Sequence, residues 1–142
     1  YGLKYVSVLL KYWQTVIVLV TVLQTQRDKL VSESLNVVGP EIERGLTSIM
    51  TSALKDGDAS AAYQASIKLR SLLLGRLYAN RFLIENDDQS RARAIRKFRD
   101  VELNQSNLAA ELENPERKKL ANEIKVNQEN TCMHLIRSIK SF

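Results

Sequence analysis

The stretch from Ala59 to Leu83 contains no proline and a single glycine, and apolar residues cover well over half of its helical circumference. Alternate steps of four and three residues select one stripe along it, which is the heptad spacing that keeps one face of a helix against a partner helix. We therefore expect a long helix packed in a bundle, with this stripe as its seam. The stripe consists of Tyr63, Ile67, Arg70, Leu74, Leu77, Arg81 and Ile84.

The composition favours helices along the whole chain. The 142 residues are enough for one domain with its own core. Only 5 glycines and 2 prolines accompany a hydrophobic content of 44% and a charged content of 26%, which is typical of an all-helical protein rather than a β-sandwich or barrel.

Three turn signals divide the chain into helices. Gly57 lies between two aspartates at 56–58, a second polar turn follows at 86–88, and Asn114 precedes Pro115 as a helix cap. The glycine–proline pair at 39–40 has no loop residues around it, so we interpret it as a kink or a tight restart. The prediction is all-α: an up-down-up-down four-helix bundle with an over-long first helix, and later helices at about 59–85, 89–113 and 115–142.

The apolar pattern also predicts the core. In the first helix the stripe after the glycine–proline pair is Ile42, Leu46, Ile49 and Ala53. In the third bundle helix the apolar face carries Ile95, Phe98, Val101, Leu108 and Leu112. In the last helix it carries Leu120, Ile124, Thr131, Leu135 and Phe142.

The first helix is about twice as long as the others. Residues 31–142 are sufficient for the bundle, so residues 1–30 project beyond it as part of one helical module covering residues 1–142. The projecting half carries an apolar stripe through Trp13, Val16 and Val20. Its uncharged run at 12–26 is shorter than the roughly 20 residues of a membrane span. We therefore expect protein to cover it, as a homodimer or higher oligomer formed through residues 9–30.

Several function classes are disfavoured by what the sequence lacks. The net charge is +5, but the densest basic cluster at 91–99 has little aromatic interleaving, so nucleic acid is not an expected partner. Cys132 and His134 are the only cysteine and histidine, which gives no metal-binding set and no nucleophile–base pair. We expect neither an enzyme nor a cofactor.

Two arginines on the predicted seam suggest an anionic ligand. A guanidinium keeps its charge and grips a carboxylate with two parallel hydrogen bonds, so Arg70 and Arg81 are candidates for binding a small organic acid. The alternative is that both lie at the seam edge in water, or pair with an acidic residue such as Glu102, Glu123 or Glu129. Further polar candidates for the same ligand are Tyr63, Tyr78, Asn127, Thr131 and Arg27.

Four segments resemble the helical bimodular (HBM) sensor domain of bacterial methyl-accepting chemotaxis proteins and sensor kinases. They are RDKLVSESLNVVGPEIERGL, ALKDGDASAAYQA, LLLGRLYANRFL and ENPERKKLANEI, and they span Arg27 to Ile124. Domains of this family consist of two stacked four-helix bundles that share long helices and lie between two transmembrane helices.

The resemblance implies a ligand-binding sensor domain of a chemoreceptor on the periplasmic side of the bacterial inner membrane. Such a domain binds a small molecule, here a small carboxylate, and transmits a helix displacement across the membrane. The chain would hold one complete bundle and part of the second, and its transmembrane segments would lie outside residues 1–142. The alternative is an intracellular helical-bundle interaction protein with no small-molecule ligand.

Overall fold

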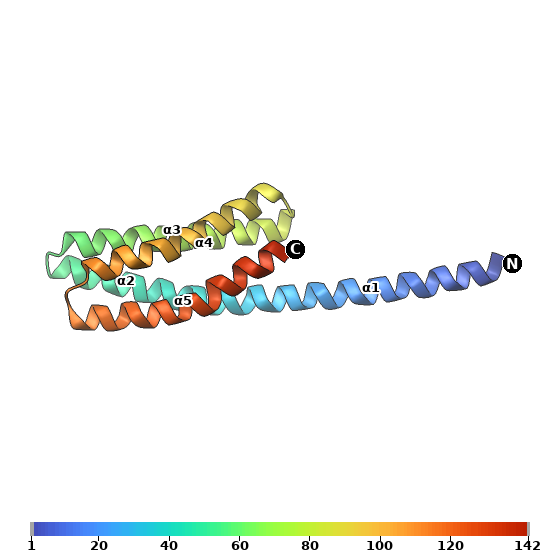
Figure 1. Cartoon of the computed structure of the whole chain (residues 1–142), viewed down its shortest axis with the longest axis horizontal. Coiled ribbons are helices and arrows are strands. Elements are labelled where there is room, and N and C mark those ends of the chain that lie inside the picture. The colour runs from blue at the N-terminus through green and yellow to red at the C-terminus, as the bar shows by residue number, and fades with distance from the viewer. Residues whose placement is uncertain (1, 142) are drawn as a thin grey trace.

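The computed structural model describes residues 2–141, and within these residues every regular element is a helix (Figure 1). Tyr1 and Phe142, which the sequence analysis assigned to the first and last helices, lie outside the described residues. The all-α four-helix fold is confirmed. The elements are α1 (Gly2–Glu33), the short π-helix η1 (Ser34–Val38), α2 (Gly39–Lys55), α3 (Ala59–Glu85), α4 (Asp88–Glu111) and α5 (Pro115–Ser141).

The predicted turn signals end and start the helices through local hydrogen bonds. Gly57 adopts a positive φ of 75°, and the Asp58 carboxylate caps α3 by accepting from the Ala61 amide at 3.1 Å. Asp87 caps α4 in the same way, accepting from the Ser90 amide at 2.8 Å. Short capped turns of this kind make consecutive helices antiparallel neighbours.

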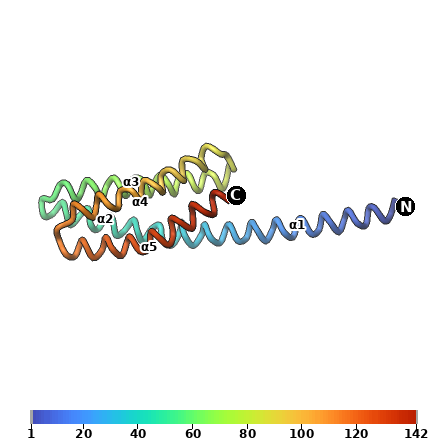
Figure 2. The backbone as a smooth tube through the Cα atoms, in the orientation of Figure 1, coloured from blue at the N-terminus to red at the C-terminus, as the bar shows by residue number. Residues whose placement is uncertain are grey.

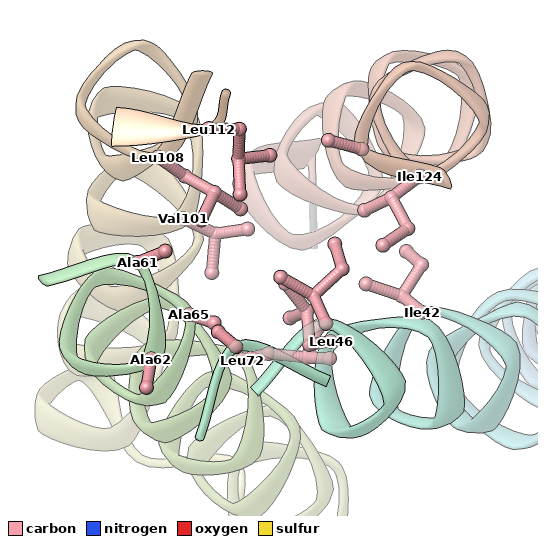
Figure 3. Packing of buried hydrophobic residues seen from close by; sticks show 13 residues of the cluster. Ile42, Leu46, Ala61, Ala62, Ala65, Leu72, Val101, Leu108, Leu112 and Ile124 are labelled. Atoms are coloured by element: carbon pink, nitrogen blue, oxygen red, sulfur yellow. The ribbon is translucent and has the colours of Figure 1, made fainter. Parts of the chain in front are cut away.

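The four bundle helices close a ring around two neighbouring clusters of buried residues. Helix α2 packs on α3 and α5, and α4 packs on the same two helices. The predicted stripe of α2 is inside, since Ile42, Leu46, Ile49 and Ala53 are at most 1% exposed. Figure 3 shows Ile42 and Leu46 facing Ile124 of α5, with Val101, Leu108 and Leu112 of α4 across the core.

The predicted seam of α3 is wrong, because that stripe points away from the bundle. Tyr63 is 62% exposed, Leu77 is 58% exposed and Ile84 is 84% exposed. The face that is buried has the same heptad spacing but a different phase, and it consists mainly of small side chains. Its members are Ala61, Ala65, Lys68, Leu72, Gly75, Ala79 and Phe82.

Small residues face inward because α3 and α4 lie very close together. A Cβ atom placed on Gly75 would lie 2.9 Å from Cε1 of Phe98, which is inside van der Waals contact. A large side chain at such positions would force the helices apart. The sequence analysis chose the stripe of α3 that carries large apolar residues, and that stripe is the outer face of the helix.

The long first helix passes through the glycine–proline pair without a loop. Pro40 has no amide hydrogen to donate to the carbonyl four residues earlier, and its ring crowds that carbonyl. The backbone widens into η1, where the Gly39 amide donates to the Ser34 carbonyl five residues back. Figure 2 shows the backbone running without interruption from α1 into α2, so the predicted over-long first helix is confirmed and there is no restart at the glycine–proline pair.

The π-turn also accommodates one extra residue in the apolar repeat. The buried positions Val31, Leu35, Gly39, Ile42 and Leu46 follow steps of four, four, three and four, where a strict heptad would alternate. A π-turn is an insertion of one residue into an α-helix. It therefore keeps Val31 and Leu35 on the same core-facing side as Ile42.

The first part of α1 is uncovered within this chain. Residues 2–30 include no buried residue, and in Figure 1 they extend well beyond the bundle. An 18-residue window of the long helix reaches a mean hydropathy of 1.8 with 0% of it buried, so by length and composition the helix is able to cross a membrane. The exclusion of a span from the sequence was too strict, since it counted only the uncharged run.

We predict that deleting Asn36, an exposed residue of η1, is tolerated. The deletion converts the π-turn into an ordinary α-turn and leaves Val31 and Ile42 facing the core. The matched control deletes Thr47, an exposed residue of α2, which rotates the flanking helical segments by about 100° relative to each other. Thermal melts should place the first variant within a few degrees of the parent and the second far below it; equal losses would contradict the bulge interpretation.

Candidate anion-binding site

Lys68 occupies a core position of α3 and is 0% exposed. Ala65 and Leu72, one turn before and after it, belong to the same hydrophobic cluster. The Lys68 ammonium donates a hydrogen bond to Oε1 of Gln105 on α4. Nε2 of Gln105 in turn donates to the Ala121 carbonyl at 3.4 Å, which fixes the orientation of the amide. Lys68 is thus held in the core by a neutral partner.

A buried ammonium is costly unless an anion accompanies it. Among residues 2–141, no carboxylate lies within ion-pairing distance of Lys68. Burial lowers the pKa of Lys68 from 10.5 to about 8, and only the neighbouring Cys132 opposes this change. At neutral pH the core therefore holds a positive charge with unused N–H donors.

Arg117 is the only other buried cation among the described residues, and unlike Lys68 it has carboxylate partners. Arg117, at the start of α5, is 6% exposed and lies 2.6 Å from an Asp56 carboxylate oxygen and 3.4 Å from one of Asp58. Its guanidinium also donates to the Ser52 hydroxyl at 3.1 Å. These bonds tie α5 to the turn between α2 and α3, which is a structural role. Lys68 has no such carboxylates.

Helix α5 adds further buried polar groups to this part of the core. Gln128, Thr131 and Cys132 are 2%, 8% and 1% exposed. Oε1 of Gln128 is buried and has no hydrogen-bond partner among the described residues. Burial raises the pKa of the Cys132 thiol to about 12, with Glu102 contributing in the same direction, so this cysteine is a neutral thiol and not a nucleophile.

A groove between α4 and α5 is lined by two of these buried polar residues, Gln105 and Gln128. Its volume is about 440 Å³, within the roughly 300–1,000 Å³ typical of small-molecule pockets. Gln105 lines the groove and also bonds Lys68, so its side chain lies between the groove and the buried ammonium. The other polar residues lining it include Glu102, Asn122, Lys125, Gln128 and Glu129.

The structure does not gather the arginines and Tyr63 predicted from the sequence into this site. Arg70 and Tyr63 lie on the exposed face of α3. Arg81 is also exposed and pairs with Glu85 of its own helix at 2.8 Å, which raises its pKa. Neither arginine pairs with Glu102, Glu123 or Glu129, which the sequence analysis named as alternative partners. Tyr63, Arg70 and Arg81 were chosen with the incorrect phase of the α3 seam.

The remaining predicted residues are divided among different places. Tyr78 is partly buried and carries the Arg93 guanidinium over its ring at 5.5 Å. Asn127 is exposed on α5, and Arg27 lies on α1, 3.1 Å from the adjacent Asp28 carboxylate. Thr131 alone lies in the core, three residues after Gln128. One of the seven predicted residues is therefore buried in the core of the bundle.

Sequence analysis missed Lys68, Gln105 and Gln128, although a signal for them exists. Each is the polar member of an otherwise apolar or small-residue heptad, such as Phe98, Val101, Gln105, Leu108 on α4. A polar residue at the same kind of position in three neighbouring helices indicates a polar layer in the core. Finding it required the correct phase of α3.

Comparison with known proteins assigns no family to the chain. No protein family, no curated protein and no solved structure matches it. The resemblance to HBM sensor domains therefore rests on the four quoted segments, and function has to be argued from the geometry of the bundle.

We predict that Lys68→Met stabilises the bundle at pH 7. The pKa of Lys68 is lower in the folded state than in the unfolded state. Below about pH 8 the side chain is charged in both states, so burying the charge lowers the free energy of unfolding of the parent by its full amount. Between about pH 8 and 10 the folded protein loses the proton while the unfolded chain keeps it, and the free energy of unfolding of the parent rises. The advantage of the variant, about 3 kcal/mol at most, should therefore shrink with pH.

The measurement is urea denaturation of both proteins from pH 7 to 10. Lys118→Met, at an exposed position on α5, is the control and should show no pH-dependent difference. A Lys68→Met advantage that stays constant with pH would mean that the ammonium is not penalised by burial.

Proposed function

We propose that this chain is the extracytoplasmic sensor module of a membrane receptor that binds a small carboxylate in the core of its bundle. The observation that carries the proposal is Lys68, a fully buried ammonium with no carboxylate of residues 2–141 within ion-pairing distance. The parent receptor belongs to the chemoreceptor and sensor-kinase class that the quoted segments resemble.

A structural role explains Lys68 poorly. An apolar side chain of similar length would fill the same space, and replacing buried charges by apolar groups is often neutral or stabilising. A ligand carboxylate supplies the missing anion and forms charge-assisted hydrogen bonds with the ammonium in a dry environment. The groove at Gln105 gives such a ligand a route between α4 and α5.

The membrane side of the proposal is supported by α1. Apolar residues surround this helix at residues 16–20, so a single partner helix would leave most of them in water. The hydroxyls of Thr15, Thr21 and Thr25 donate to carbonyls four residues earlier at 3.0, 2.8 and 2.9 Å, and therefore need no water. We therefore propose that α1 crosses the lipid bilayer and that the bundle lies on the periplasmic side.

The second candidate is a helical interaction protein without a small ligand. The exposed side chains of residues 9–30 also suit a second copy of the chain, as the sequence predicts, and a homodimer through α1 follows from that arrangement. This candidate leaves Lys68 and the orphaned oxygen of Gln128 without a purpose, so we favour the sensor.

We predict that at least one small carboxylate binds the purified bundle and raises its melting temperature. Lys68→Met should weaken binding roughly 10- to 150-fold, which corresponds to a charge-assisted hydrogen bond of about 1.5–3 kcal/mol. Isothermal titration calorimetry with monocarboxylates, dicarboxylates and amino acids measures this effect, with Lys118→Met as the control that keeps full affinity. Binding that survives Lys68→Met unchanged places the ligand elsewhere.

We also predict that α1 determines where the protein resides. The full chain should float with phospholipid vesicles in a density gradient, whereas a version beginning at Arg27 should stay in solution, because both core clusters lie after residue 30. Light scattering without lipid tests the homodimer. If the full chain does not bind vesicles and forms a dimer, the result favours the interaction protein. If it does not bind vesicles and stays monomeric, neither a bilayer nor a second copy covers α1, and both candidates are contradicted.

A further inference from the structure

The groove between α4 and α5 is lined by acceptors that lack partners, and one of its lining residues, Gln105, accepts a hydrogen bond from the buried Lys68. Glu102 on α4 is partly buried and forms no ion pair or hydrogen bond with any of residues 2–141. Oε1 of Gln128, on the opposite wall, is buried and also without a partner. A carboxylate and an amide oxygen both accept hydrogen bonds, so this part of the groove calls for a donor, and a cationic donor above all.

Glu102 and Lys68 are connected through Gln105, which lines the groove together with Glu102 and accepts a hydrogen bond from Lys68. Both charges act on the Cys132 thiol, Glu102 raising its pKa and Lys68 lowering it. Glu102 also lies three residues before Gln105, which places both on one face of α4. Glu102 therefore lies one turn of α4 from the hydrogen-bond partner of Lys68, and the two charges do not form an ion pair with each other.

The rim carries one more charged pair that faces the groove. Lys125 and Glu129 lie one turn apart on α5, with 3.8 Å between the ammonium and the carboxylate. They satisfy each other and are more than half exposed, so they contribute little net charge. The charges left for a ligand are thus one buried ammonium and one partly buried carboxylate.

We infer that the ligand of this site is a small zwitterion, a carboxylate that also bears an ammonium group, as in an α-amino acid. This inference rests on the proposed function and specifies its ligand class. The ligand carboxylate takes the place of the Gln105 amide on Lys68, while its ammonium donates to Glu102 and to Oε1 of Gln128. A dicarboxylate would bring a second negative charge against Glu102 and is disfavoured.

The test compares ligands that differ by the amino group alone. Calorimetric titrations pair alanine with propionate and glutamate with glutarate on the parent protein. We expect the amino acid of at least one pair to bind at least tenfold more tightly than its deaminated counterpart. Lys68→Met should weaken both members of that pair, since each uses its carboxylate on the ammonium.

Glu102→Gln separates the two halves of the ligand. It should weaken the amino acid at least tenfold while leaving the deaminated acid unchanged or tighter, and Gln128→Leu should act in the same direction as an independent variant. Glu123→Gln, which removes an exposed carboxylate of α5 that does not line the groove, is the matched control and should leave both affinities unchanged. Melting temperatures of all variants establish that they are folded.

Two outcomes would overturn the inference in distinguishable ways. If deaminated acids bind as tightly as amino acids and Glu102→Gln does not discriminate between them, the zwitterion is wrong while a carboxylate sensor stands. If no carboxylate of either kind binds the folded parent, the proposed function fails and the ligand class fails with it.

Discussion

The close approach of α3 and α4 is the constraint on which the rest of the bundle depends. Gly75 has no room for a Cβ against Phe98, so α3 must turn its small residues inward. Lys68 belongs to that same heptad face and is therefore carried into the core, whatever its own preference for water. The packing of small side chains fixes the phase of α3, and the phase of α3 decides which cation is buried and which arginines stay outside.

The phase of α3 also separates the features of the fold that could be predicted from the sequence from those that could not. The turns at 56–58, 86–88 and 114–115 follow from local capping chemistry, and the inward stripe of α2 follows from its clear amphipathic pattern, so both were predicted correctly. Helix α3 is apolar on both sides, and its periodicity supports two stripes equally well. The choice between Leu77 and Gly75 depends on how near α4 lies, which is a tertiary property that no pattern within α3 contains.

The outer stripe of α3 is a consequence of the same arrangement. Because the small face is inside, large apolar residues such as Leu73, Leu77 and Ile84 remain exposed. Arg70 and Arg81 alternate with them along the helix and keep part of this surface hydrated. The arginines that suggested a ligand from the sequence thus accompany the exposed apolar face, while the cation buried in the core is Lys68.

Two of the helices around the buried ammonium, α5 and α3, contact the long helix at or beside its π-turn. Helix α5 packs on η1 and on α1. Helix α3 reaches the same place through Arg76, which pairs with Glu43 at 2.9 Å and lies so close to Gly39 that a Cβ there would be 2.9 Å from its Nε. A shift of α5 therefore changes its contacts with η1 and with α1. Since η1 is the one place where the long helix departs from α-geometry, it is where such a shift is most easily absorbed or passed to α1.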